Sequence, residues 1–498
     1  MRARLASVPM LVVLIAGTGL LMQVPAFKAL VDREHQIARA FFYSGLICLV
    51  LSVFFALALS ASQRRSRSGG LFPLLTTIYL LVPAVMAVPL AEALPQMRFV
   101  DAWFEMISGF TTTGASLIDL PRRVPQAVHL WRGLSGWLGG LFILSAATAL
   151  LAPIGLGGYE LIHRSPGAQT RAGMAGATAG RRLMAHAQVV LPAYAGLTLG
   201  LWFLLTLFGV PGFDALMQAM ATLSTSGILA RETLGNTGLL PEMALFAFMV
   251  VALSRRFLPG HGDRPRPLHR DPELVTAALI VALVSLFVLA RHWAGAFEIA
   301  EGENLPAIGR AAWGAAFTSL SYLTTTGFVS QDWIASRVWS GLTPPGLVLM
   351  GLALLGGGVA TTAGGVKLLR VFALTRLGKF ELERTLYPSL VIGGNEYDRF
   401  LATTGARAAW LFAMVFSLTA VVVVALLLVS GMSLETGLIF AAAALSNTGP
   451  LVQVAGDLPL YWVLVGDPAR LVLAAAMILG RLEILVLLAL FIARTQRG

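Results

Sequence analysis

Long apolar runs alternate with shorter, semi-polar runs along most of the chain. Two apolar runs come first, at about residues 7–27 and 39–60. After an arginine cluster, the order of long apolar run, short semi-polar run and long apolar run occurs four times. A helix needs about 20 apolar residues to cross a bilayer, and many of these runs approach that length. The pattern therefore predicts a polytopic membrane protein. The first apolar run is not followed by a clear small-residue cleavage site, so we expect it to be a retained helix and not a signal peptide.

The four repeats predict a regular division of the chain. The expected elements are 71–92, 101–113 and 131–153, then 187–209, 213–225 and 239–257, then 273–293, 307–326 and 345–375, and finally 407–430, 434–448 and 469–493. We expect two accessory helices in residues 1–70, followed by repeats at 71–162, 163–258, 259–390 and 391–498.

Each short run ends in a phrase of small hydroxylic residues closed by glycine. The four phrases are "GFTTTGASLI" from Gly109, "ATLSTSGILA" from Ala221, "SYLTTTGFVS" from Ser321 and "AALSNTGPLV" from Ala443. One such phrase is typical of a turn between helices. Four copies, roughly 100 to 120 residues apart and always before a long run, instead favour a repeated subdomain with a shared role.

The charge distribution indicates topology. The chain is 57% hydrophobic, 12% charged and carries a formal net charge of +11. Its basic connections are 63–68, 163–186, 254–273 and the tail "ARTQRG", whereas Glu298, Glu301 and Glu303 cluster in another connection. Basic connections lie in the cytoplasm. If the short runs re-enter without crossing, all the basic connections and both termini fall on the cytoplasmic side. The four phrases then face outward. The basic excess thus fits topology and lipid headgroups better than nucleic acid.

The phrases suit a cation pathway. Non-helical backbone at membrane depth is tolerated where it is buried in protein or lines a watery path. Four copies around an axis would supply a ring of carbonyl oxygens that replaces the hydration shell of a monovalent cation. Glycine permits the backbone angles required, and the C-terminal end of each short helix would direct its partial negative charge toward the ion.

The phrases also resemble a known family. "MISGFTTTGAS", "LSTSGI", "LTTTGF" and "LSNTGP" are similar to the four filter segments of the Trk/Ktr/HKT superfamily of cation transporters. The two N-terminal helices, "TTAGGVKLLR" (361–370) and "GRLEILVLL" (480–488) resemble its TrkH branch most, and the resemblance covers essentially the whole chain.

The resemblance implies a fold and a function. The fold is an all-α polytopic membrane protein with four pseudo-symmetric helix–pore-loop–helix repeats around a central pore, plus two N-terminal accessory helices. The function is K+ uptake across the bacterial cytoplasmic (inner) membrane, with both termini cytoplasmic. A homodimer and a cytoplasmic TrkA-type nucleotide-binding regulatory ring are the implied partners. No bound cofactor is expected, and K+ is the permeating ion.

The resemblance also assigns the filter residues. They lie near 110–116, 222–229, 323–330 and 445–451, and the ion-contacting set is Thr112, Thr113, Gly114, Thr225, Ser226, Gly227, Thr325, Thr326, Gly327, Asn447, Thr448 and Gly449. Some plant relatives that prefer Na+ have serine at the first filter glycine. Glycine at all four positions favours K+; a sodium-permeable or weakly selective transporter of the same superfamily is the alternative.

A glycine-rich stretch, "LALLGGGVATTAGGVKLL", interrupts the long run expected at 345–375. Glycine also serves close helix packing in membranes, but this density predicts a broken helix near 356–367 that lines a cavity. In the family this loop lies below the filter and obstructs the pore. The corresponding gate residues are Gly356, Gly357, Gly358, Thr361, Thr362, Gly364 and Gly365, although Gly358 and Val359 differ from the usual cysteine- and serine-containing form.

Several charged residues have two interpretations each. Arg481 and Glu483 lie in the last apolar run, where the arginine would set an electrostatic barrier below the filter or form a structural salt bridge. Lys367 ends the glycine-rich stretch, either in the pathway or at the cytoplasmic edge. Asp214 and Glu435 begin short runs and Glu105 lies early in the first one, as helix caps or as attractors of cations.

An enzyme is a poor alternative for this chain. The apolar runs carry no nucleophile with a neighbouring base and no facing pair of acids. The single cysteine, Cys48, excludes internal disulfides and cysteine-rich metal sites.

Overall fold

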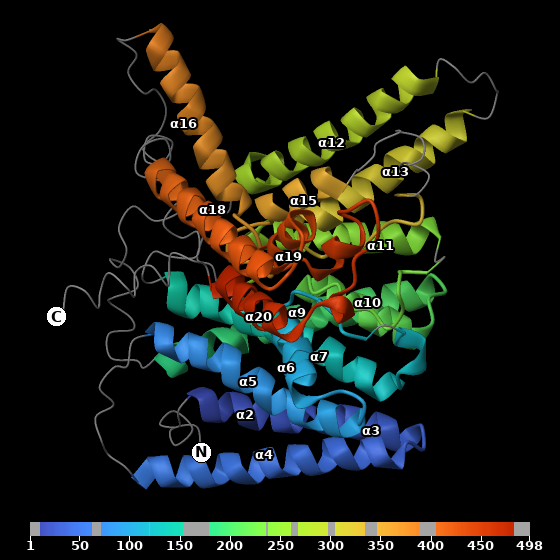
Figure 1. Cartoon of the computed structure of the whole chain (residues 1–498), viewed down its shortest axis with the longest axis vertical. Coiled ribbons are helices and arrows are strands. Elements are labelled where there is room, and N and C mark those ends of the chain that lie inside the picture. Colours follow the sequence, from blue (N-terminus) through green and yellow to red (C-terminus); the bar gives the residue numbers. More distant parts are fainter. Residues whose placement is uncertain are drawn as a thin grey trace, which may run out of the picture.

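The computed structural model describes residues 10–61, 71–118, 120–152, 179–235, 238–259, 267–296, 304–333, 346–387 and 405–482. These residues form helices joined by turns and loops, with no strand among them (Figure 1). Six helices are long and apolar enough to cross a membrane: Met10–Val31, His35–Ala58, Leu74–Ala93, Gln126–Leu151, Gly180–Leu207 and Ala406–Val429. The expected all-α polytopic fold class is confirmed.

The first two spans pack as a pair at one edge of the molecule. Helices α2 (Met10–Leu21) and α3 (Gln23–Val31) make up one span, and α4 (His35–Ala61) returns beside it (blue in Figure 1). The pair crosses closely, since a Cβ added to Gly45 would lie 2.8 Å from the carbonyl oxygen of Gly19. Contacts from α2, α3 and α4 to the helices that follow attach the pair to the rest of the bundle.

The remaining helices follow the expected order of long, short and long elements. Unit one has α5 (Leu71–Ala93), α6 (Phe99–Phe110) and α7 (Gln126–Ala146), which continues through a π turn at Ala147–Leu151. Unit two has α9 (Ala179–Leu207), α10 (Gly212–Ser224) and α11 (Leu239–Met249). Unit three has α12 (Pro272–Ala296), α13 (Asn304–Leu323), α15 (Gly346–Leu355) and α16 (Leu368–Leu386). Unit four has α18 (Ala406–Val429), α19 (Leu434–Leu445) and α20 (Asp467–Leu482).

Short 3₁₀ turns connect several of these helices. They lie at Pro121–Arg123, Val250–Leu253, Arg255–Phe257, Leu268–Arg270, Gly449–Gln453 and Trp462–Leu464.

The short helices cannot cross a bilayer in three of the four units. Helices α6, α10 and α19 have 12, 13 and 12 residues. At 1.5 Å per residue they are about 18–20 Å long, against a hydrocarbon core of about 30 Å. Helix α13 is longer, with 20 residues, and begins at Asn304. These lengths are compatible with the re-entrant segments that the charge pattern predicts around α6, α10 and α19.

Helix α11 is shorter than the expected run at 239–257. It ends at Met249 and gives way to the 3₁₀ turn Val250–Leu253. The carbonyl of Ala252 accepts a 3.0 Å hydrogen bond from the Gly358 N–H, and Ser254 is extended, with φ −149° and ψ 135°. Because these backbone groups pair with a distant segment, the helix does not continue.

The four units close into a ring. Helix α7 packs on α9 and α10, and α11 packs on α13. Helix α15 packs on α19 and α16 on α18, while α20 packs on α5 and α6 and so joins unit four to unit one. In Figure 1 α12 and α13 lie at the edge opposite α4, and α16 projects beyond the other helices. This closure places the ends of the four short helices at the centre of the bundle.

Candidate ion pathway

The four glycine-ended phrases have the same backbone structure at the ends of α6, α10, α13 and α19. We call residues 112–114, 225–227, 325–327 and 447–449 segments one to four. The first residue of each is left-handed: φ is 54° at Thr112, 53° at Thr225, 59° at Thr325 and 55° at Asn447. This conformation is uncommon for any residue other than glycine and is costly for β-branched threonine. Its recurrence in all four segments indicates a shared structural demand.

A common hydrogen bond holds each left-handed residue in place. The next residue donates its N–H to the carbonyl five positions earlier: Thr113 to Ser108 at 2.8 Å, Ser226 to Ala221 at 3.0 Å, Thr326 to Ser321 at 2.9 Å and Thr448 to Ala443 at 2.9 Å. This is the long bond of a Schellman-type helix end. The chain thereby turns sharply out of the helix and becomes available to its neighbours.

Paired hydroxyls bridge each left-handed residue. Oxygen–oxygen distances are 2.8 Å for Thr111 and Thr113, 2.9 Å for Ser224 and Ser226, 3.0 Å for Thr324 and Thr326, and 3.2 Å for Ser446 and Thr448. All eight side chains are buried. The sequence reasoning left out Thr111, Ser224, Thr324 and Ser446. The signal that identifies them is the two-residue spacing of hydroxyls in all four phrases.

The segments contact one another in cyclic order. A Cβ added to Gly114 would overlap the carbonyl oxygen of Ser226, and one added to Gly227 would overlap that of Thr326. A Cβ on Gly327 would lie 2.9 Å from Pro450.

Segment four then meets segment one. The N–H of Gly449 donates a 2.5 Å hydrogen bond to the carbonyl oxygen of Thr113. The structure thus brings Gly114, Gly227, Gly327 and Gly449 to one centre, with backbone carbonyls between them.

Glycine is required for two different reasons in these segments. Gly114, Gly227 and Gly327 have φ of 75°, 63° and 80°, which a side chain would strain. Gly449 begins a 3₁₀ turn, and there a Cβ would collide with the backbone of Gly114 and Ala115.

A buried ion pair supports segment one from behind. Glu105 accepts a 2.6 Å hydrogen bond from Nε of Arg132 and a 2.7 Å bond from the N–H of Leu117. Arg132 also donates to the Ser116 hydroxyl at 2.7 Å. Glu105 lies in the middle of α6 and is buried, so neither helix capping nor attraction of cations at an open mouth describes it. Since a buried charge requires a partner, this pair fixes the non-helical chain that follows segment one.

Glu242 supports segment three in a similar way. Its carboxylate accepts hydrogen bonds from the Trp313 indole at 2.8 Å, the Ser330 hydroxyl at 2.8 Å and the Gln331 N–H at 2.9 Å. The sequence reasoning overlooked both Glu242 and Arg132. Each is a charged residue within an apolar run, which is the signal that could have found them.

The two remaining acids lie at the starts of short helices. Asp214 forms a 2.6 Å ion pair with Arg231, and Glu435 lies in the first turn of α19, where the Ser433 hydroxyl caps the helix.

The glycine-rich stretch is a hairpin loop between α15 and α16. The N–H groups of Val366, Lys367 and Leu368 donate to the carbonyls of Leu354, Leu355 and Gly357, each at 2.9 Å. The two sides of the loop touch at Gly356 and Gly365, which have φ of 74° and 73°. A Cβ on Gly365 would lie 2.7 Å from the Cα of Gly356. These two glycines therefore allow the chain to turn back on itself.

The loop contacts three of the four short-helix ends. The N–H of Gly364 donates a 2.8 Å hydrogen bond to the Thr325 hydroxyl, and the Thr362 hydroxyl donates to the Leu223 carbonyl at 3.1 Å. A Cβ on Gly364 would overlap the Ser446 carbonyl oxygen. The loop thus lies directly against segment three and the helix ends that lead into segments two and four.

The far side of the loop is held by the 3₁₀ turn that follows α11 and by the first residues of α12. The N–H of Gly358 bonds to Ala252, as described above, and the N–H of Val359 donates a 2.7 Å bond to the carboxylate of Glu273. The Thr361 hydroxyl bonds to the Gly358 carbonyl at 2.8 Å within the loop. Gly356, Gly357, Gly358, Thr361, Thr362, Gly364 and Gly365 thus all lie in this buried hairpin.

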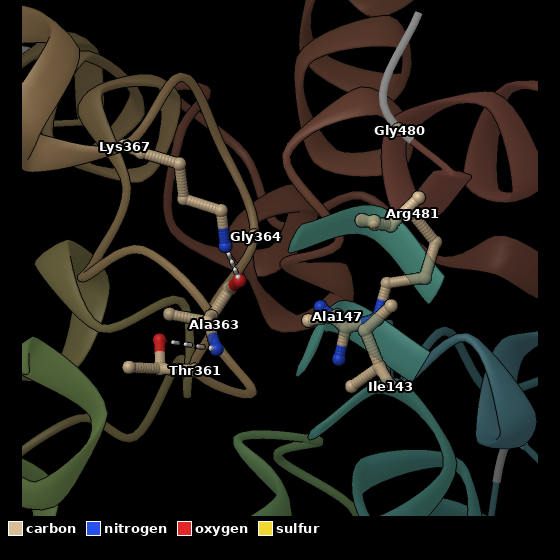
Figure 2. A pocket seen from close by; sticks show the side chains of 10 residues that line it. Ile143, Ala147, Thr361, Ala363, Gly364, Lys367, Gly480 and Arg481 are labelled. Carbon is tan, nitrogen blue, oxygen red and sulfur yellow. Dashed lines mark hydrogen bonds between the residues drawn. The ribbon is translucent and has the colours of Figure 1, made fainter. Parts of the chain in front are cut away.

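Two cationic side chains face a small cavity between the loop and α20. Its walls include Thr361, Gly364, Lys367, Gly480 and Arg481. Figure 2 shows Lys367 and Arg481 entering from opposite sides. Both are buried, at 7% and 4% exposure, so Lys367 lies inside the protein rather than at its edge.

Each of these two side chains donates a hydrogen bond to a neighbouring group. Lys367 donates to the Ala363 carbonyl, and Arg481 donates to the Thr112 hydroxyl of segment one. Glu483 lies outside the described residues. Within the described part of the chain, no cluster of three His, Cys, Asp or Glu side chains could hold a metal ion.

Comparisons with known proteins also indicate similarity to cation transporters. The profile of the TrkH family, described as cation transport protein, matches residues 276–497. The chain is 27% identical to the Trk system potassium uptake protein TrkH of Salmonella typhimurium, over 98% of each chain. It is 28% identical to the TrkH of Vibrio parahaemolyticus, over 80% of this chain and 79% of that protein. The chain is similar to TrkH proteins along nearly its whole length.

The fold of the chain also matches a solved structure. The crystal structure of the potassium transporter TrkH from Vibrio parahaemolyticus superposes with a TM-score of 0.78 at 24% identity, and the match covers 98% of both chains. The described residues of the chain therefore have the fold of this solved transporter.

Proposed function

We propose that this chain is a potassium uptake protein, through which K+ permeates along the centre of the ring formed by segments one to four. The cyclic contact between the segments carries this proposal, because it directs carbonyl oxygens from four backbone turns at one point. Rings of backbone carbonyls replace the water around an alkali cation. The names of its relatives supply the ion.

The ion-contacting residues are those of the segments themselves: Thr112, Thr113, Gly114, Thr225, Ser226, Gly227, Thr325, Thr326, Gly327, Asn447, Thr448 and Gly449. Permeation needs no chemical step in this chain. A cation that moves inward gains about 2.3 kcal/mol per 100 mV of membrane potential.

The glycine-rich loop acts as the gate. It lies against the helix ends below the segments, and residues 356–365 would have to move for an ion to pass. Its glycines permit such a change of backbone conformation. Lys367 and Arg481 add a positive potential at the same depth, which opposes a cation until they are displaced or neutralised.

The proposed assembly and location rest on the resemblance to the Trk/Ktr/HKT superfamily and on the distribution of basic residues along the chain. We place the chain in the bacterial inner membrane as a homodimer of separate pores, with cytoplasmic termini and a TrkA-type nucleotide-binding ring as its regulator. The repeats run over residues 71–162, 163–258, 259–390 and 391–498, after accessory helices in 1–70.

Growth rescue tests the proposal. A bacterium that lacks its own potassium uptake systems should grow on low K+ when it expresses this chain, with and without a TrkA-type partner. Gly114→Ser should abolish rescue or raise Na+ permeation relative to K+, because the added side chain meets the Ser226 carbonyl oxygen. Gly196→Ser in α9 is the matched control, since a Cβ there meets no atom within 4 Å. Equal rescue on low K+ by wild type and empty vector contradicts the proposal, and Na+ uptake at the rate of K+ supports the weakly selective alternative.

A further inference from the structure

Segment four differs from the other three in the hydrogen bonding of its glycine carbonyl. Gly449 does not share the positive φ of Gly114, Gly227 and Gly327, and Pro450 follows it within a 3₁₀ turn. The Gly449 carbonyl accepts a 3.1 Å hydrogen bond from the indole Nε1 of Trp462. No donor in the described part of the chain contacts the carbonyls of Gly114, Gly227 or Gly327.

The indole of Trp462 is itself fixed by two short helices. It is 3% exposed. Its ring lies 4.9 Å from that of Phe440 on α19, at 78°, and 5.9 Å from that of Phe104 on α6. Edge-to-face contacts of this kind are favourable beyond the area they bury. Through Trp462, the position of the Gly449 carbonyl therefore depends on helices of both unit four and unit one.

Both peptide groups of Gly449 are thus engaged. Its N–H bonds to Thr113, and its carbonyl bonds to Trp462. A carbonyl that already accepts an indole N–H presents a weaker field to an ion than one with both lone pairs available. Selectivity between alkali cations depends on the number and field strength of the coordinating carbonyls. A stronger field favours the smaller Na+, because it better offsets the larger cost of dehydrating that ion.

We infer that Trp462 is a specificity-determining positioning residue, which lowers the field of the fourth filter carbonyl and thereby favours K+ over Na+. This inference rests on the proposed function. It assigns the role to one indole N–H rather than to the bulk of the side chain.

The test is the ratio of Na+ to K+ flux in proteoliposomes that contain the full chain. Trp462→Phe keeps an aromatic ring between Phe104 and Phe440 but removes the donor. We expect the Na+/K+ ratio to rise about threefold or more, since loss of one such bond shifts an equilibrium by a factor of about 2 to 13. Trp131→Phe is the matched control. Trp131 is also fully buried and donates a 3.0 Å indole hydrogen bond to a backbone carbonyl, that of Met86, away from the segments.

A second variant separates the hydrogen bond from packing. Benzothienylalanine at position 462 replaces the indole N–H by sulfur within the same bicyclic shape, and it should raise the ratio as Phe does. An unchanged ratio in this analogue overturns the inference, whether or not the Phe variant folds. A ratio that rises equally in Trp131→Phe also overturns it. If wild-type vesicles take up no K+ above protein-free vesicles, the proposed function fails first and the inference falls with it.

Discussion

The N–H of Gly364 donates a 2.8 Å hydrogen bond to the side-chain hydroxyl of Thr325. One residue belongs to the glycine-rich loop and the other to segment three, so this bond joins the proposed gate directly to the proposed filter. Both groups are buried, where an unmet donor costs about 1–3 kcal/mol. The position of the loop therefore depends on a threonine that sequence reasoning had assigned to the ion pathway alone.

Thr325→Val should loosen the loop and raise K+ flux about two- to tenfold, because valine keeps the β-branched shape but accepts no hydrogen bond. Thr325→Ser should behave like wild type. Thr225→Val serves as the control, since the Thr225 hydroxyl bonds to the neighbouring Ser224 carbonyl instead of the loop. Rubidium uptake into vesicles measures the effect, and equal flux in the two valine variants would contradict this role.

Glu273 should hold the opposite side of the same loop. Its carboxyl oxygen accepts the Val359 N–H at 2.7 Å, and Val359 is fully buried, where an unmet donor costs about 1–3 kcal/mol. Glu273→Ala should raise K+ leak more than Glu273→Gln, because glutamine retains an oxygen that can accept this hydrogen bond. Glu381→Ala, at an exposed site on α16, is the control. Identical leak in the Ala, Gln and wild-type proteins would exclude this latch.

Removal of the Arg481 charge should speed K+ permeation. Two unit charges about 8 Å apart repel by about 2 kcal/mol at an effective dielectric constant of about 20, so Arg481→Gln should raise the flux roughly thirtyfold. Arg481→Lys keeps the charge and should remain slow. Single-channel or vesicle flux at fixed voltage distinguishes the two variants. Equal K+ flux through Arg481→Lys and Arg481→Gln would contradict a role for the charge, and would leave the hydrogen bond to Thr112 as the feature of Arg481 that affects the flux.

An ion-pair cluster should make the join between units one and four sensitive to acid. Asp101 on α6 bonds to Arg98 at 2.9 Å and to Arg470 on α20 at 2.6 Å. The hydrogen bond from Arg98 is the first cause that lowers the pKa of Asp101 below its usual value. A lowered pKa contributes stability above the unfolded value, near 4, and this stability is lost as the pH falls through the folded value.

Melting temperatures in detergent test this dependence. Wild type should exceed Asp101→Asn by a constant margin between pH 5 and 7, and the margin should shrink below pH 4. High salt should reduce it at any pH, because these side chains are partly exposed. A margin that stays constant down to pH 3 would contradict the assignment.

The sequence predicted the helices well because their signal is local. Apolar runs of spanning length identify α4, α5, α9 and α18 with ends within several residues of those observed. The four phrases were evident from repetition, and so was the interruption between Leu355 and Leu368, because glycine weakens a helix wherever it clusters.

The contacts that orient the site depend on the tertiary fold. Glu105 and Arg132 are 27 residues apart, and the partner of Glu105 was not evident while it was interpreted as a cap. The early end of α11 depends on Gly358, more than a hundred residues later in the chain. Thr112 and Thr325 look equivalent in the phrases, yet one meets Arg481 and the other meets the loop. Repetition predicts what the segments share, and their different neighbours decide how they differ.

The packing of α20 against α5 and α6 also bears on biosynthesis. Helix α20 is the last described element, and it occupies the seam beside the first repeat. A chain that ends before Asp467 would lack this contact, so the faces of α5 and α6 that α20 covers would be left unpaired in such a fragment.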